Sequence, residues 1–264
     1  ALVLPNCPQH VVAFYAALRL GAIVIEHNPL YTAKELRHQY EDHGAKVSIV
    51  WDKVYDTIAE FPSDIRQARM VSVTMTDEFP LTKRLALRLP VAKARTLRAQ
   101  LTTTPASRRV YDWNKLVSHR RLSPRHPRPS ITDTALLQYT SGTTGSPKGA
   151  ILSHGNLRSN AAQGRAWVPG LREGKENFYG VLPLFHAYGM TLCLTFAMSI
   201  GARLVLFPKF DADLVFAAAK KTPPTFLPAV PPIYEALARA TPKRRKGLTR
   251  IRFAISGAMS LPPS

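Results

Sequence analysis

The chain has 264 residues, 45% of them hydrophobic, which is enough for a sizeable core in one large or two small domains. Its 36 lysines and arginines against 17 acidic residues give a formal net charge of +19. Such a balance suits anionic partners: a phospholipid surface, CoA, ATP or nucleic acid. Two cysteines, Cys7 and Cys193, exclude a disulfide-dense scaffold and favour a reducing cytoplasm.

Residues 1–74 alternate between short apolar runs and amphipathic segments. We predict strands at 1–4, 22–25, 47–51 and 70–74, and helices at 8–20, 33–43 and 52–61. Thr32 with Glu35 three residues later predicts a capping box at the start of the second helix, and Gly44 predicts its end. Alternation at this spacing indicates an α/β fold with mostly parallel sheets flanked by helices on both faces.

Residues 79–126 interrupt this alternation with a basic segment. Twelve lysines and arginines stand there against one acid, Asp112. Leucines recur at helical spacing, and Pro90 divides two short predicted helices. Two interpretations remain open: a surface insertion whose apolar face packs on the domain, or a basic amphipathic segment that lies on an anionic membrane.

A proline-rich linker at 123–130 then separates a first α/β subdomain, residues 1–130, from a second, residues 131–264. In the second we predict strands at 135–139, 150–152, 180–184, 203–207, 225–228 and 253–256, with helices at 154–167, 211–221 and 231–240 and a buried helix ending near 200. The stretch 177–202 carries no formal charge, but Pro183 and His186 interrupt it, which favours a buried core segment over a transmembrane helix.

A loop rich in glycine and hydroxyl groups lies between the predicted strands 135–139 and 150–152. Its glycines, Gly142, Gly145 and Gly149, let backbone N–H groups close around an anion. Side-chain donors come from Thr140, Ser141, Thr143 and Thr144, and Lys148 supplies a positive charge. The loop lacks the spacing of a Walker P-loop. It therefore predicts a phosphate-binding site of another kind.

The segment Leu137–Gly149 resembles the AMP-binding signature of the adenylate-forming superfamily. That superfamily holds acyl-CoA synthetases, 4-coumarate–CoA ligases, firefly luciferases and peptide-synthetase adenylation domains. The resemblance covers nearly the whole chain and is greatest to bacterial long-chain fatty-acid–CoA ligases. It implies that Lys148 and Thr143 act in catalysis, that Thr143 meets Mg²⁺, and that the nucleotide contacts Thr140, Ser141, Gly142, Thr143, Thr144, Gly145 and Lys148.

Two further blocks resemble the family's motifs in the expected order. Pro183–Gly189 resembles an aromatic-rich elbow, which implies that His186, Tyr188 and Gly189 lie at the acyl and nucleotide pockets and that His186 takes part in catalysis. Ser256–Pro262 resembles the block whose backbone lies against adenine, which implies nucleotide contacts from Gly257 and Ala258. Lys209, after a predicted strand, resembles a lysine near CoA, although a solvated surface lysine explains it equally well.

The resemblance implies a fatty acyl-CoA synthetase that uses ATP, Mg²⁺ and CoA in fatty-acid metabolism. The cysteine content favours the cytoplasm, and the basic segment 79–126 leaves peripheral contact with an anionic membrane open. Family members are longer, so we expect an internal fragment with little or no activity alone. A fatty acyl-AMP ligase or an aryl-acid CoA ligase is an alternative within the superfamily. A basic membrane- or nucleic-acid-binding module is an alternative of another class, but no nucleic-acid-binding signature accompanies the charge.

Overall fold

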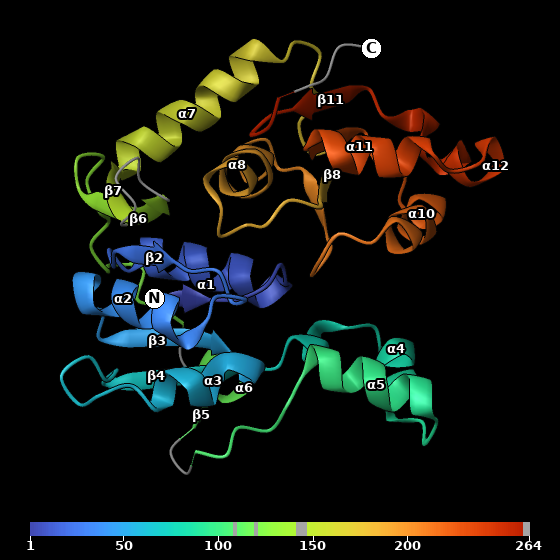
Figure 1. The fold of residues 1–264 in the computed structure, drawn as a ribbon. Coiled ribbons are helices and arrows are strands. Elements are labelled where there is room, and N and C mark those ends of the chain that lie inside the picture. The colour runs from blue at the N-terminus through green and yellow to red at the C-terminus, as the bar shows by residue number, and fades with distance from the viewer. Residues whose placement is uncertain (108–109, 119–120, 141–146, 261–264) are drawn as a thin grey trace. The chain divides into compact units, whose positions relative to one another are not determined.

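The computed structural model describes residues 1–107, 110–118, 121–140 and 147–260 (Figure 1). The chain forms two compact units, Ala1–Leu152 and Ser153–Ser264. This division lies later than the boundary expected at 130/131. The reason is that strand β6 (Thr134–Thr140) pairs with strand β2 (Val24–Glu26), so β6 and its neighbour β7 (Lys148–Ser153) belong to the first sheet.

The first unit is built on a seven-stranded sheet with the order β5-β4-β3-β1-β2-β6-β7. Its remaining strands are β1 (Leu2–Val3), β3 (Val47–Trp51), β4 (Arg69–Val73) and β5 (Tyr111–Asp112). The pairs from β5 through β6 are all parallel. The connection 141–147 is too short for a parallel crossover, so β7 returns antiparallel to β6. The mostly parallel sheet predicted from the sequence is confirmed.

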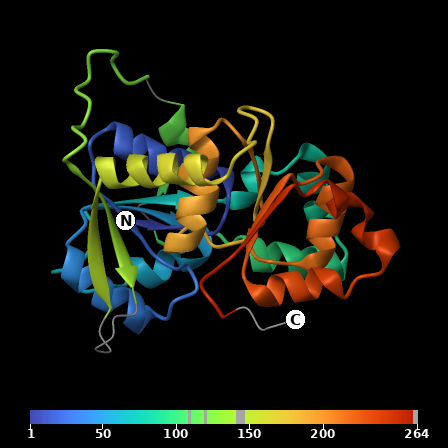
Figure 2. The ribbon, with the colours of Figure 1, turned by 90° about the horizontal axis from the view of Figure 1, so that it is seen from above.

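Helices cover both faces of this sheet because the strand order reverses. The chain moves from β1 to β2 in one direction and from β2 back past β1 to β3 in the other. Right-handed crossovers then place α1 (Pro8–Arg19) on one face, with α2 (Ala33–His43) and α3 (Asp52–Ala59) on the other (Figure 2). Leu36 and Tyr40 of α2 pack on Val3 and Val50 of the strands.

The helix α2 begins and ends where the sequence predicts. The Thr32 hydroxyl accepts a hydrogen bond from the Glu35 backbone N–H at 3.3 Å, and the Glu35 carboxylate accepts from the Thr32 N–H at 2.7 Å. Gly44 follows in the left-handed region with φ of 56°. The capping box and the glycine stop are therefore confirmed.

The basic segment contains the two short helices expected on either side of Pro90, namely α4 (Leu81–Arg88) and α5 (Ala92–Leu101). The indole N–H of Trp51 donates to the Leu101 carbonyl at 2.9 Å and ties the end of α5 to the sheet. Three short elements in and next to this segment were not predicted from the sequence: η1 (Met75–Glu78), strand β5 and α6 (Trp113–Val117). They are too short to show a period.

The second unit has a four-stranded parallel sheet with the order β11-β10-β8-β9. Its strands are β8 (Asn177–Gly180), β9 (Arg203–Leu206), β10 (Phe226–Ala229) and β11 (Phe253–Ser256). Its helices are α7 (His154–Trp167), α8 (Ala187–Gly189), the π-helical η2 (Met190–Phe196), α9 (Ala197–Ser199), α10 (Ala212–Lys221), α11 (Pro231–Ala238), α12 (Pro242–Arg245) and η3 (Lys246–Arg250).

Alternate residues of these strands supply two separate cores. Phe178 and Phe226 stack with ring centroids 4.1 Å apart and meet Phe196 of η2 on one face. The next residues along the strands, Tyr179 and Leu227, belong to the core beneath α10 and α11 on the other face. Successive side chains of a strand point to opposite faces, so each core forms under its own set of helices.

The strand predicted at 180–184 is wrong. The strand β8 covers 177–180, and the chain turns directly after it. Val181 and Leu182 are buried, so their apolar character reflects the core and not a strand. The uncharged stretch 177–202 forms β8, this turn and the buried helical run α8–η2–α9. Among the described residues, no helix combines the length and apolar character that a membrane crossing requires.

Candidate active site

Thr140 and Lys148 stand at the two ends of the signature loop in the first unit. Thr140 is the last residue of β6 and Lys148 the first of β7, and both are exposed. The other residues predicted for the phosphate site, Ser141, Gly142, Thr143, Thr144 and Gly145, lie outside the described residues. The described flanks therefore place Lys148 at the root of a strand–loop–strand unit.

The site residues predicted in the second unit all follow the carboxyl ends of its strands. His186, Tyr188 and Gly189 come after β8, and Lys209 comes after β9. Gly257 comes directly after β11. In an open parallel sheet the carboxyl ends of the strands share one edge, and ligands bind there. The structure thus gathers the second and third family blocks at a single edge of this sheet.

Tyr188 joins these two blocks directly. Its hydroxyl donates to the Ile255 carbonyl of β11 at 2.9 Å, with the Ala229 carbonyl of β10 at 3.4 Å. Burial raises the pKa of Tyr188 to about 12, so the hydroxyl keeps its proton and remains a donor. This side chain was expected at the acyl and nucleotide pockets, and in the structure its hydroxyl holds the elbow to the ends of β10 and β11.

Two glycines at this edge allow contacts that no side chain would permit. A Cβ at Gly189 would lie 2.0 Å from the Pro183 carbonyl oxygen, which is impossible without moving the backbone. A Cβ at Gly257 would lie 2.9 Å from Cζ of Tyr188. Gly189 lets the backbone of the elbow pack against Pro183, and Gly257 lets the hydroxyl end of the Tyr188 ring approach the third block.

His186 caps the short helix α8 with its imidazole. The Tyr188 backbone N–H donates to His186 Nδ1 at 3.3 Å, so in the neutral ring the proton is on Nε2. The side chain is exposed. It therefore presents an N–H donor at the carboxyl edge, suited to binding an oxygen of a carboxylate or phosphate. Lys209 is also exposed there and adds a positive charge.

Ala258 adopts a backbone conformation that alanine rarely takes. Its φ is 61°, and among the described residues it is the one non-glycine residue with φ in the left-handed region. That conformation costs roughly 1–2 kcal/mol for a residue with a Cβ. Strained backbone of this kind is concentrated at functional sites. It turns the chain sharply after Gly257, at the block expected to meet adenine.

Tyr234 of α11 is a site residue that the sequence analysis missed. Its hydroxyl donates to the Leu227 carbonyl at 2.6 Å and lies 3.1 Å from the Ile255 carbonyl, the same oxygen that Tyr188 reaches. A tyrosine within an apolar helix was the signal in the sequence, because its hydroxyl needs a hydrogen-bond partner once the side chain is buried. Two tyrosines thus fix the end of β11.

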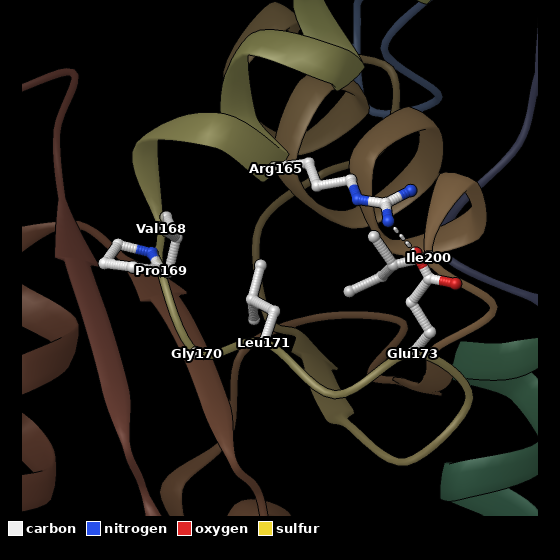
Figure 3. A pocket seen from close by; sticks show the side chains of 7 residues that line it. All are labelled: Arg165, Val168, Pro169, Gly170, Leu171, Glu173 and Ile200. Atoms are coloured by element: carbon white, nitrogen blue, oxygen red, sulfur yellow. Dashed lines mark ion pairs between the residues drawn. The ribbon is translucent and has the colours of Figure 1, made fainter.

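A shallow pocket of about 300 Å³ lies elsewhere in the second unit. Figure 3 shows the ion pair between Arg165 and Glu173 at its rim. Its lining residues are Arg165, Val168, Pro169, Gly170, Leu171, Glu173 and Ile200. They precede β8 and β9, so the pocket lies at the amino edge of the sheet, away from His186 and Gly257. None of the residues predicted for the active site lines it.

The described residues contain no group of three or more histidine, cysteine or acidic side chains that could hold a metal ion. A Mg²⁺ ion held by one protein hydroxyl and by substrate phosphates, as the family resemblance implies, would not require such a group. Its predicted contact, Thr143, is outside the described residues. Both cysteines, Cys7 and Cys193, are free and buried.

Comparisons with known proteins agree with the motifs. The long-chain-fatty-acid–CoA ligase of Bacillus subtilis is 32% identical over 99% of this chain, and 4-coumarate–CoA ligase 1 of Arabidopsis thaliana is 30% identical over 98% of it. The chain spans 46% of the first relative and 43% of the second, so it covers about half of their length.

Solved structures share the fold over the whole chain. The anthranilate CoA ligase AuaEII, in complex with anthranoyl-AMP, matches 99% of this chain and 45% of its own, with a TM-score of 0.80 at 22% identity. The N-terminal domain of FACL13 from Mycobacterium tuberculosis matches 99% and 56%, with a TM-score of 0.69 at 22% identity. The family model of the AMP-binding enzymes matches residues 1–264, and the chain belongs to that family.

Proposed function

We propose that this chain is the nucleotide- and acyl-binding part of a long-chain fatty-acid–CoA ligase. The observation that carries the proposal is the gathering of the second and third family blocks at one carboxyl edge, locked by the Tyr188–Ile255 hydrogen bond. The names of the relatives from Bacillus subtilis and Yersinia pestis support the fatty-acid substrate, at 32% and 31% identity. Because another relative is named 4-coumarate–CoA ligase 1, an aryl acid is the alternative substrate.

The proposed reaction has two steps. A carboxylate oxygen of the acid attacks the α-phosphorus of ATP, forming acyl-adenylate and releasing pyrophosphate. The thiol of CoA then attacks the acyl carbonyl carbon, the thioester forms, and AMP leaves with the electron pair of the broken C–O bond. Mg²⁺ would offset phosphate charge when bound. A fatty acyl-AMP ligase, which passes the acyl group to a carrier protein, shares the first step.

The residues of this chain supply binding and orientation in that reaction. Lys148 places a positive charge at the root of the signature loop, where it would bind the α-phosphate that remains in the acyl-adenylate and offset charge that develops on the leaving pyrophosphate. The Nε2–H of His186 would donate to a carboxylate oxygen and orient it. We assign His186 no role as a base, because a carboxylate is already a nucleophile. Gly257 and Ala258 would present backbone to the adenine.

Replacing Lys148 by alanine is expected to weaken binding of a non-hydrolysable acyl-adenylate analogue by about 10- to 100-fold, the loss that goes with one charge-assisted hydrogen bond. Thr143→Ala, which removes a predicted donor, is expected to weaken it less. Isothermal titration of the whole chain measures both. Lys220→Ala is the control, since Lys220 lies in the last turn of α10, which leads into the start of β10 and so to the edge opposite the carboxyl ends. Equal affinity in all variants would contradict the proposed site.

A second proposal concerns the basic helical pair α4–α5. Leu81 and Leu85 lie four residues apart on one side of α4 and are 67% and 54% exposed, and Leu89, directly after the helix, is 53% exposed. Lysines and arginines surround them, and no acid occurs from residue 79 to residue 111. Exposed leucines within a basic surface suit an anionic lipid bilayer, where apolar side chains enter the interface and cations meet headgroups.

We expect the chain to sediment with phosphatidylserine vesicles at low salt and to release as salt rises. Reversing two charges with Lys83→Glu and Arg88→Glu should weaken this binding by about tenfold or more. Lys243→Glu with Arg245→Glu makes the same change of charge on α12 and should weaken it far less. Equal loss in both variants would point to the net charge of +19 and not to α4–α5.

A further inference from the structure

Tyr139 occupies a central place at the root of the signature loop. It is the residue before Thr140 at the end of β6. Across the hairpin its ring lies over Gly149, the residue after Lys148: a Cβ on Gly149 would be 3.4 Å from Cζ of Tyr139 and 3.7 Å from both Cε atoms. The ring therefore packs on the backbone that carries Lys148, and glycine at 149 lets it approach.

The other end of Tyr139 is held by helix α2. Its hydroxyl donates to the Asp42 carboxylate, on the last turn of α2 and 97 residues away in sequence. Helix α2 is itself fixed, because Leu36 and Tyr40 are buried in the core of the first unit and the capping box defines its start. The hydrogen bond links the hairpin to a rigid element.

A network of neutral groups supports the face of the Tyr139 ring. The ring stacks on His27, with centroids 6.1 Å apart and planes at 24°. The backbone N–H of Ala45 donates to His43 Nδ1 at 3.0 Å, which leaves the proton of neutral His43 on Nε2. That proton is donated to His27 Nε2 at 3.1 Å, and His27 Nδ1–H in turn donates to Gln39 Oε1 at 2.5 Å.

Both imidazoles stay uncharged near neutral pH. Burial and the neighbouring His43 lower the pKa of His27 to about 3, and burial lowers the pKa of His43 to about 4. Every ring nitrogen of the pair then has a partner with one consistent set of tautomers. The ring of Tyr139 thus rests on a fully hydrogen-bonded, neutral surface, and only its hydroxyl meets a carboxylate.

We propose that Tyr139 is a positioning residue for Lys148. By packing on Gly149 and bonding to Asp42, it fixes the hairpin β6–β7 to α2 and sets the direction from which Lys148 meets the phosphates. This inference rests on the proposed function, because it takes Lys148 as a phosphate ligand. It adds α2, an element outside all three family blocks, to the machinery of the site.

The first test is titration with the acyl-adenylate analogue. Tyr139→Phe removes the hydroxyl and keeps the ring, and Asp42→Ala removes the acceptor. Each is expected to weaken binding by about three- to tenfold, and the double variant should be no weaker than either single one. Asp42→Asn keeps an oxygen acceptor and should retain most of the affinity. Unchanged affinity in Tyr139→Phe would overturn the proposal, provided that Lys148→Ala binds less tightly in the same titration.

The second test requires no ligand. Hydrogen exchange at the amides of Gly149 and Ala150 is expected to be several-fold faster in Tyr139→Phe and Asp42→Ala than in the wild type or Asp42→Asn, with the melting temperature unchanged. Equal exchange in all four proteins would overturn the positioning role. If the wild type and Lys148→Ala both fail to bind the analogue while exchange responds as expected, the proposed function fails and the anchoring of β6–β7 to α2 stands.

Discussion

Replacing Glu26 by alanine is expected to lower the free energy of unfolding of the first unit by about 3–5 kcal/mol, the cost of breaking a buried ion pair by removing one partner. Both oxygens of Glu26 on β2 lie 3.0 Å from His10 Nε2 on α1, and both side chains are completely buried. Without Glu26 the buried imidazole would keep its backbone partners, Leu4 and the Pro5 carbonyl at 3.3 Å, but would lose its charged partner. Equilibrium denaturation measures the loss.

This effect is also expected to depend on pH. Burial alone would lower the pKa of His10, but the charge and hydrogen bond of Glu26 outweigh it and raise the pKa. The stability that the pair contributes is therefore complete below the unfolded-state pKa of about 6.5 and is lost as pH rises through the higher folded-state pKa. In Glu26→Gln the carboxylate charge is gone, and burial, the largest influence on the pKa of His10, is opposed mainly by the backbone hydrogen bonds to Pro5 and Leu4. We therefore expect this variant to lose further stability below about pH 6.5. The difference from wild type should grow as pH falls from 8 to 5.5.

An exposed ion pair provides the matched control. Arg37 and Glu41 on α2 lie 2.7 Å apart and are about half exposed. Glu41→Ala should therefore cost less than about 1 kcal/mol and show little dependence on pH in this range. A double variant of His10 and Glu26 to leucine should be more stable than either single replacement. A loss in Glu26→Ala no larger than that in Glu41→Ala would contradict the account of the buried pair.

The elements that the sequence predicted well carry local signals. The capping box of Thr32 and Glu35, the stop at Gly44 and the break at Pro90 are each decided by neighbours within a few residues. The parallel sheets followed from alternation of strands and helices. The order of the three family blocks placed His186 and Gly257 after strand ends, and the parallel sheet brought those ends to one edge.

The contacts that organise the site were beyond the sequence because they join distant segments. Tyr139 meets Asp42 across 97 residues, and Tyr188 meets Ile255 across 67. A hydroxyl and its acceptor leave no periodic trace, so neither pairing could be read from either segment alone. The wrong strand at 180–184 has a different cause. Val181 and Leu182 are apolar because they fill a core, and a short apolar run has the same appearance in the sequence whether it forms a strand or only packs in a core.

Replacing Gly189 by alanine is expected to destabilise the second unit by about 3 kcal/mol, the upper end of what overpacking costs. The backbone of Gly189 is helical, so alanine would fit its conformation. The obstacle is space alone: the new Cβ would lie 2.0 Å from the Pro183 carbonyl oxygen and 2.7 Å from its carbon. Both are backbone atoms, so the elbow must open. Thermal and denaturant unfolding of the whole chain measure the loss.

Opening the elbow should also carry Tyr188 away from Ile255, because Tyr188 is the residue before Gly189. Affinity for the acyl-adenylate analogue should then fall even in the fraction of Gly189→Ala that remains folded. Gly180→Ala is the control in the same unit, since its Cβ would first meet the end of the Leu206 side chain at 3.2 Å, which can turn aside. If both variants lost the same stability, the tight elbow would not be the cause. If Gly189→Ala were less stable but bound the analogue normally, the elbow would hold the fold together without shaping the ligand site.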